Sequence, residues 1–410
     1  MSPAPDSHPP APEHCSLADL GQQVRIVWTT LLIEEAGIRR PTDLARTWKL
    51  DQTLCTRLYQ ALKEPDSSLV LRHLPAPASL RTILVRARKA QVDGLSVEMA
   101  SQTIRALTEM IDRVGGSKAN LDTVAARHIT GVRQKVEHAA KQQIFRGMAS
   151  MLGVHARTSV VQVYLFPGEE PGTCDELGVH GFHGLLRLRP ELGVLLGVRE
   201  ALPDSGSDED VVLAALHGTE FDKGGLTTAL REFCTSPFPE IELRHEGGKL
   251  LYALEPSPDS LPGEIDLFFA SFERGAARLH ATPENPRVRE AFVANTPSQN
   301  TVYDIFVHKD LWPNIEPELH MLRTGDPRVP DLAAHSFDRL DFVENMNALG
   351  SSPSALPLKE YERYGELVEH VHERMGWGLG DFRCYRTLIR YPICGIWYSI
   401  QIPLPEEPKS

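Results

Sequence analysis

The spacing of apolar residues changes once along this chain of 410 residues, and that change limits the folds open to it. Up to about residue 152, apolar side chains recur at intervals of three and four, the spacing of helices that bury one face. From about Val154 onward, short β-branched and aromatic runs alternate with turn residues, which is typical of strands. The sequence therefore predicts a multi-domain protein, with an all-α N-terminal part followed by a larger α+β domain over residues 153–410.

Residues Pro41 to Leu62 predict two short helices joined by a tight corner. Pro41 suits the first position of a helix, where a missing amide hydrogen costs nothing. Asp51 is placed to cap the second helix by accepting from its free backbone amides. Leu54, Leu58 and Leu62 then recur every four residues on the side that would be buried. A helical hairpin inside an all-α domain and a DNA-binding helix-turn-helix both fit this spacing.

The opposite side of the second helix is polar, which suits base edges and phosphates in a major groove. Four of its side chains are predicted to contact bases, namely Gln52, Thr53, Thr56 and Arg57. Gln60 lies on the same face and is included in the predicted interface. Three neighbouring cations, Arg46, Lys49 and Lys63, are predicted to contact backbone phosphates.

The pattern DLAR, LD and CTRLYQAL within residues 17–64 resembles the helix-turn-helix of bacterial transcriptional regulators. Lys49 and Leu50 stand at the corner where many members of that family have glycine. The resemblance implies a DNA-binding domain over residues 16–78 and double-stranded DNA as a partner. It also implies that the C-terminal domain is regulatory, and that it senses a small-molecule or protein effector or mediates assembly.

Charge is distributed unevenly along the chain. Residues 1–21 hold no Lys or Arg and 3 acids, residues 22–150 hold 20 bases and 12 acids, and residues 151–410 hold 23 bases and 40 acids. The net charges are therefore −3, +8 and −17, which sum to the formal −12 of the whole chain. A basic segment in an acidic protein favours contact with phosphates, although a solvated helical surface has the same composition.

Residues 79–152 predict a helical connector. Val97, Ala100, Ile104, Leu107 and Ile111 alternate spacings of three and four, so they form a stripe that packs against another helix. The partner helix can belong to the same chain or to a second copy, and a homodimer would suit a two-fold operator. A further helix over about residues 120–151 is predicted to pack on the first.

In the C-terminal part, Ile241–His245 and Lys249–Leu254 predict a β-hairpin around a glycine pair. Helices are predicted at Leu226–Cys234, Arg287–Ala294 and Lys359–Met375. At the other end of the chain, residues 1–15 are Pro-rich and polar, and they predict a disordered tail. No run of about 18 apolar residues and no signal-peptide pattern is present, so we expect a cytoplasmic protein without a membrane partner.

No spacing typical of a catalytic motif occurs, and no cofactor is expected. The one group with metal-ligand chemistry is Cys174 with His180 and His183, which lie within ten residues in CDELGVHGFHG. A glycine-rich loop with two surface histidines fits the same segment. Two alternatives to a DNA-binding regulator therefore stay open: an interaction or scaffold protein that uses the helical N-terminus, and a metal-assisted enzyme in the C-terminal domain.

Overall fold

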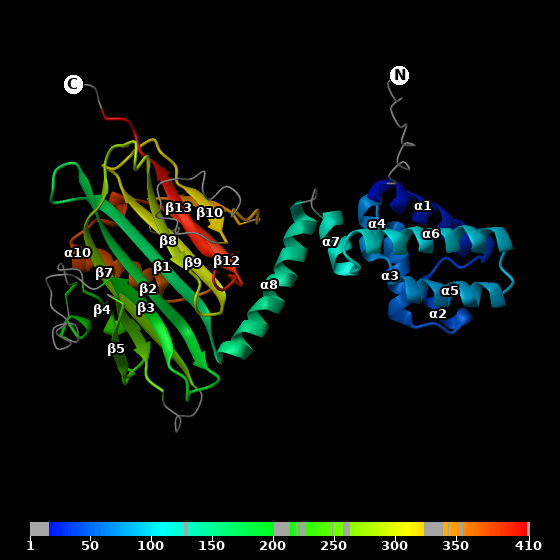
Figure 1. The fold of residues 1–410 in the computed structure, drawn as a ribbon, viewed down its shortest axis with the longest axis horizontal. Coiled ribbons are helices and arrows are strands. Elements are labelled where there is room, and N and C mark those ends of the chain that lie inside the picture. Colours follow the sequence, from blue (N-terminus) through cyan, green and yellow to red (C-terminus); the bar gives the residue numbers. More distant parts are fainter. Residues whose placement is uncertain are drawn as a thin grey trace, which may run out of the picture. The chain divides into compact units, whose positions relative to one another are not determined.

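The structure is a computed structural model that describes residues 16–126, 130–200, 214–218, 220–221, 226–247, 249–256, 263–323, 339–342, 344–351 and 356–407. The tail predicted over residues 1–15 lies outside these ranges. The chain divides into two compact units, Met1–Val136 and Glu137–Ser410. The first is helical and the second is built around β-sheets (Figure 1), as the change in apolar spacing predicted.

The N-terminal unit contains short helices that follow one another closely. They are α1 Leu17–Thr29, a π-helical segment Thr30–Glu35, α2 Pro41–Trp48, α3 Gln52–Lys63, α4 Ser67–His73, α5 Pro77–Lys89, α6 Gly94–Arg113 and α7 Lys118–Ala126. The start of α1 is fixed locally, because the Ser16 side chain accepts from the Asp19 amide while Asp19 accepts from the Ser16 amide. The residues predicted to begin α2 and to cap α3, Pro41 and Asp51, do so.

One hydrophobic core holds these helices together, and Trp28, Leu44 and Leu58 are among its buried members. The Trp28 indole Nε1 donates to the Thr103 hydroxyl at 3.0 Å, which satisfies the one polar atom of that ring inside the core. Helices α1 and α4 approach so closely that a Cβ added at Gly21 would stand 1.8 Å from the Ser67 carbonyl oxygen. Glycine is therefore required at that crossing.

The apolar stripe of α6 is buried in the same core. Its members Val97, Ala100, Ile104 and Leu107 are at most 3% exposed, and α6 packs against α5 and α1 of its own chain. The stripe therefore serves intramolecular packing, one of the two partners that its spacing allowed, and it is not available as a dimer seam. Residues 79–126, predicted to belong to a connector, thus share a core with the helix pair at residues 41–63.

Helix α8, Thr130–Leu152, runs across the boundary between the two units. The predicted helix over residues 120–151 is divided in the structure into α7 and α8, and residues 127–129 between them lie outside the description. Within the C-terminal unit, the Gln142 amide donates to the Tyr391 hydroxyl at 3.2 Å, and the Phe145 ring lies 5.3 Å from the Tyr391 ring. These contacts join the second half of α8 to the sheet-rich unit.

In the part of the C-terminal unit that the structure describes there are three sheets and the helix α10, Tyr364–Met375. Its strands are β1 Val154–Pro167, β2 Thr173–Arg187, β3 Val194–Glu200, β4 Thr228–Ala229, β5 Ile241–Glu246, β6 Lys249–Leu254, β7 Glu264–Arg278, β8 Arg287–Val293, β9 Ser298–His308, β10 Glu318–Leu322, β11 Met346–Gly350, β12 Phe382–Arg390 and β13 Trp397–Pro403. The main sheet has the order β11-β12-β9-β1-β2-β7-β4, and two smaller sheets have the orders β10-β13-β8 and β3-β6-β5. Only the pair β1 and β9 of the main sheet is parallel among the described pairs.

Both faces of the main sheet are covered in its centre. Alternate residues of β9 belong to different cores: Val302 and Phe306 pack with α10, whereas Tyr303 and Ile305 pack with residues of the sheet β10-β13-β8. A strand that is buried on both faces has a nearly continuous apolar sequence, and β9 fits that rule. The polar residue Asp304, which is fully buried in the same strand, is therefore an exception.

Some predicted elements differ from the structure. The hairpin of β5 and β6 is confirmed, and α10 forms the main part of the predicted helix Lys359–Met375. The helix predicted over Arg287–Ala294 is wrong, because these residues form β8 and pair with β13. The helix predicted over Leu226–Cys234 is also wrong, since a two-residue strand and a 3-10 turn occupy it. No helix within the described residues is long and apolar enough to cross a membrane.

Candidate functional site

Helices α2 and α3 are joined by a corner of three residues, Lys49 to Asp51. Lys49 ends α2 in the left-handed conformation with φ of 53°, and the Leu50 amide donates to the Ala45 carbonyl at 3.0 Å. Leu50 is partly buried against the core of the N-terminal unit. Lysine thus adopts the backbone conformation for which glycine is normally selected, so the chain makes the corner without glycine.

Helix α3 has a buried face and an open face. Leu58 and Tyr59 are buried, and the Tyr59 hydroxyl donates to the Ile38 carbonyl at 2.6 Å, which ties the helix to the segment before α2. The predicted inward residues Leu54 and Leu62 are only partly buried, although both contact the core. The Arg25 guanidinium of α1 donates to the Glu64 carbonyl at 2.9 Å and so holds the C-terminal end of α3.

The structure places the predicted interface residues on the surface of this helix pair. Seven of the eight are exposed: Arg46, Lys49, Gln52, Thr53, Arg57, Gln60 and Lys63. Thr56 is only partly exposed, and its hydroxyl donates to the Gln52 carbonyl at 2.9 Å. Arg46 pairs with Asp43 at 2.9 Å, but its side chain is 81% exposed, so water weakens that pair.

Two further cations lie near Arg57 and were not predicted. Lys118, at the start of α7, donates to the Arg72 carbonyl of α4 at 3.0 Å. Burial lowers the pKa of Lys118, its ion pair with Asp122 raises it, and the positive charges of Arg57 and Arg72 lower it further. The helices α3, α4 and α7 therefore bring the cations Arg57, Arg72 and Lys118 close together. No local sequence pattern indicates this cluster, because Arg57 and Arg72 are 15 residues apart and Arg72 and Lys118 are 46 residues apart.

The geometry of α3 suits a groove of duplex DNA. Its 12 residues correspond to a length of about 18 Å. A major groove about 12 Å wide accepts one helix, and polar side chains on the open face of that helix reach base edges. Amide, hydroxyl and guanidinium groups on one exposed face are the groups that such contacts use.

The three predicted metal ligands do not come together. All three lie along β2, where His180 is six residues and His183 nine residues beyond Cys174. In an extended strand these separations correspond to about 20 and 30 Å. Burial raises the pKa of the Cys174 thiol to about 12, the His180 ring stacks on Phe269, and the His183 Nδ1 lies 3.0 Å from the Asp266 Oδ1. The structure therefore contradicts a metal site at these three residues, which the sequence left open as one alternative, and the described residues hold no other group of three or more His, Cys, Asp or Glu that fits a metal ion.

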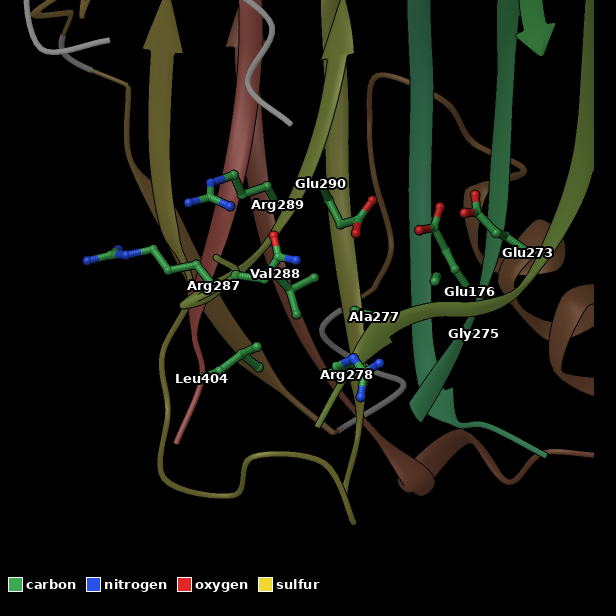
Figure 2. Close-up of a pocket in the computed structure, with 12 residues that line it drawn as sticks. Glu176, Glu273, Gly275, Ala277, Arg278, Arg287, Val288, Arg289, Glu290 and Leu404 are labelled. Carbon is green, nitrogen blue, oxygen red and sulfur yellow. The ribbon is translucent and has the colours of Figure 1, made fainter. Parts of the chain in front are cut away.

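A cavity of about 440 Å³ lies where β2 and β7 of the main sheet meet β8 of a smaller sheet. The carboxyl groups of Glu176, Glu273 and Glu290 come from these three strands and face one another across it (Figure 2). Glu176 and Glu273 are direct partners in the register of β2 and β7. Like charges at such positions repel, so the arrangement favours protonation of one carboxyl group.

Glu290 is the carboxyl group that this environment affects most. Burial raises its pKa to about 7, the charge of Glu273 adds to this effect, and a hydrogen bond with Glu176 opposes it. Glu290 and Glu176 therefore share a proton near neutral pH, which is the property that acid–base groups need. No sequence pattern indicates this site, because the spacing around Glu290 predicts a helix and not the strand β8.

Comparisons with known proteins add no family to this geometry: no family model matches the chain, and no curated protein matches it in sequence.

Replacing Lys49 by glycine tests the corner. Because the left-handed conformation is strained for lysine, Lys49→Gly should raise the free energy of unfolding by about 0.5–1 kcal/mol. Gln91, with φ of 56° after α5, is the matched control, and Gln91→Gly should stabilise by a similar amount. Denaturant unfolding measures both effects, and a loss of stability in Lys49→Gly would contradict the assigned backbone.

Replacing Glu290 by glutamine tests the shared proton. Because its folded-state pKa of about 7 lies above the ordinary value of 4.5, Glu290 contributes stability that is lost as pH rises through about 7. We expect the Tm of the wild type to fall by a few degrees between about pH 5.5 and pH 8, and that of Glu290→Gln to change less. In Glu284→Gln, at an exposed position, the Tm should change with pH as it does in the wild type. If the Tm of Glu290→Gln also changes with pH as much as that of the wild type, the raised pKa of Glu290 is refuted.

Proposed function

We propose that this protein is a cytoplasmic DNA-binding transcriptional regulator, with an N-terminal helix-turn-helix and a C-terminal sensing or assembly domain. The observation that carries the proposal is the open face of α3, where Gln52, Thr53, Arg57 and Gln60 are exposed beside a three-residue corner. The resemblance of residues 17–64 to bacterial regulators supports the same function.

In the proposed complex, α3 enters the major groove and α2 lies across the backbone. Gln52, Thr53, Thr56 and Arg57 read base edges, with Arg57 able to donate two hydrogen bonds to a guanine. Gln60 extends this surface along the helix. Arg46, Lys49 and Lys63 contact phosphates. Two further cations lie near Arg57, namely Arg72 and Lys118, of which Lys118 is paired with Asp122.

The charge distribution along the chain supports DNA contact through the helical segment. The segment 22–150 has a net charge of +8, from 20 bases and 12 acids, whereas residues 151–410 have −17, from 23 bases and 40 acids. Phosphate therefore attracts the helical segment and is repelled by the rest of the chain. A homodimer remains part of the proposal, because two-fold operators pair with two-fold proteins. Its interface must lie outside the α6 stripe, which is buried in the chain's own core.

A second candidate function is protein interaction through the helical unit. Leu95 and Met99 on α6 are 70% and 44% exposed, and Val85 on α5 is 48% exposed. Leu95 and Met99 are four residues apart and so lie on one face of α6, and apolar side chains that form one exposed patch mark a contact with another protein. Such a protein would show little salt-dependent affinity for duplex DNA, which separates the two candidates.

Replacing Arg57 by alanine tests the reading helix. If Arg57 contacts a base, Arg57→Ala should weaken binding to a preferred duplex by about 10-fold or more, corresponding to about 1–3 kcal/mol, and weaken binding to random duplex much less. Fluorescence anisotropy with both duplexes at one salt concentration measures this difference.

The matched control is Arg105→Ala. Arg105 is an exposed arginine of α6 that pairs with Glu98 at 2.9 Å, and its loss changes the net charge by the same amount. We expect the control to reduce binding to the two duplexes equally and slightly. Equal losses for Arg57→Ala on both duplexes would reduce Arg57 to a phosphate contact, and no loss on either would count against the proposed interface.

A further inference from the structure

One row of polar residues crosses five neighbouring strands of the main sheet. Arg390 of β12 is opposite Asn300 of β9, Asn300 is opposite Thr158 of β1, and Thr158 is opposite His183 of β2. At the next strand, β7, the irregular register places Asp266 beside His183. Side chains of directly paired residues lie on the same face of a sheet, so the row presents its groups together.

Asp266 fixes the histidine of this row. Its Oδ1 lies 3.0 Å from the His183 Nδ1 and accepts from the Gly184 amide at 2.7 Å. Burial raises the pKa of Asp266, but the hydrogen bonds from His183 and Gly184 outweigh it, so the pKa lies below its ordinary value. The carboxyl group is therefore charged and holds the proton of His183 on Nδ1, which leaves Nε2 to contact a ligand.

The segment before α10 lies against this row. The Thr158 hydroxyl donates to the Glu360 carbonyl at 2.7 Å, and the Arg390 guanidinium donates to the Glu360 carboxylate at 3.2 Å. The Tyr361 ring stacks on Phe268 and lies 5.0 Å from the His183 ring. Within the described residues, the buried Tyr361 hydroxyl has no hydrogen-bond partner. Buried polar groups are rarely left so, unless water or a ligand completes them.

A pocket of about 640 Å³, open to solvent on one side, lies between the row and this segment. That size lies within the range of about 300–1,000 Å³ that small-molecule sites occupy. Four cations line the cavity: Arg157, Lys359, Arg363 and Arg390. The carboxylates of the lining are Asp266, Glu360 and Glu362. Lys359 is the most available cation, because its side chain is 79% exposed and stands 3.9 Å from the nearest carboxylate oxygen.

We propose that this cavity binds a small hydroxylated organic anion of the size of a sugar phosphate or a sugar acid. Lys359 and Arg390 hold the anionic group, since ammonium and guanidinium groups are the usual partners of phosphate and carboxylate. Asn300, Gln299 and the His183 Nε2 contact the hydroxyl groups, which need both donors and acceptors. The cavity of Figure 2 has a different lining, because the carboxyl groups of Glu176, Glu273 and Glu290 meet there beside the guanidinium groups of Arg278, Arg287 and Arg289.

Binding at this cavity does not depend on DNA. Its role as the effector site of a regulator rests on the proposed function, whereas the ligand site itself stands or falls on its own measurement. Calorimetric titration of the full chain in the absence of DNA therefore separates a failure of the ligand site from a failure of the DNA-binding proposal.

The titration uses glucose 6-phosphate, gluconate, inorganic phosphate and uncharged glucose as probes. We expect saturable binding of glucose 6-phosphate or gluconate, and at least tenfold weaker binding of glucose. Tighter binding of the phosphate ester identifies a phosphate ligand, and tighter binding of gluconate identifies a carboxylate. Absence of saturable heat with both organic anions up to millimolar concentration, or binding of inorganic phosphate as tight as that of either, overturns the proposal.

Variants locate the site. Lys359→Gln and Arg390→Gln should each weaken the preferred anion by about tenfold or more, the loss expected for a charge-assisted hydrogen bond. Arg244→Gln is the control, because Arg244 is a similarly exposed arginine that pairs with Glu242 in the sheet β3-β6-β5. It should leave affinity unchanged. Equal affinity in all three variants would place the ligand elsewhere and refute the assignment.

Discussion

A buried ion pair between Asp304 and Arg386 ties the main sheet to the segment that covers it. The two residues are partners in the register of β9 and β12, and the Arg386 guanidinium donates to the Asp304 carboxylate at 2.8 and 3.0 Å. Arg386 also donates to the Leu356 carbonyl at 3.1 Å, and the Tyr364 hydroxyl donates to Asp304. A buried charge is costly without its partner, by about 3–5 kcal/mol when one member of a pair is removed.

This pair has consequences for the polar row. Leu356 and Tyr364 bound the segment that carries Glu360 and Tyr361, so fixing both ends of that segment sets its position over the sheet. The Thr158 and Arg390 contacts with Glu360 then hold its middle. The ligand cavity is therefore built on a sheet and a segment that the ion pair keeps together, which is how a rigid scaffold positions binding groups.

Much of the helical unit is predictable from the sequence, because the residues that begin and cap its helices act on neighbouring backbone groups. Pro41 at the start of α2 and Asp51 at the cap of α3 act on backbone groups a few residues away, and the structure confirms both. The exposed positions of Arg57 and Gln60 follow from the same helical period. The packing partner of the α6 stripe does not follow from the sequence, because the spacing of apolar residues does not specify which helix they contact.

The C-terminal sites were not predictable, because register brings their residues together. The polar row joins Thr158, His183 and Asp266 to residues beyond position 299, and no short-range pattern specifies those pairings. The residues around Glu290 predict a helix, but pairing with β13 makes this segment a strand and turns the Glu290 side chain toward Glu176. Cys174 and His183, close in sequence, are separated by an extended strand.

We propose that the helical unit recognises duplex DNA. Selection of the purified full chain against a random duplex library at two salt concentrations, followed by sequencing of the retained DNA, is the test of this claim. A regulator with α3 in the major groove predicts retention that falls steeply with salt and an enriched motif, palindromic if two copies bind. Absence of any salt-sensitive retention would contradict the claim and favour a protein partner for the helical unit.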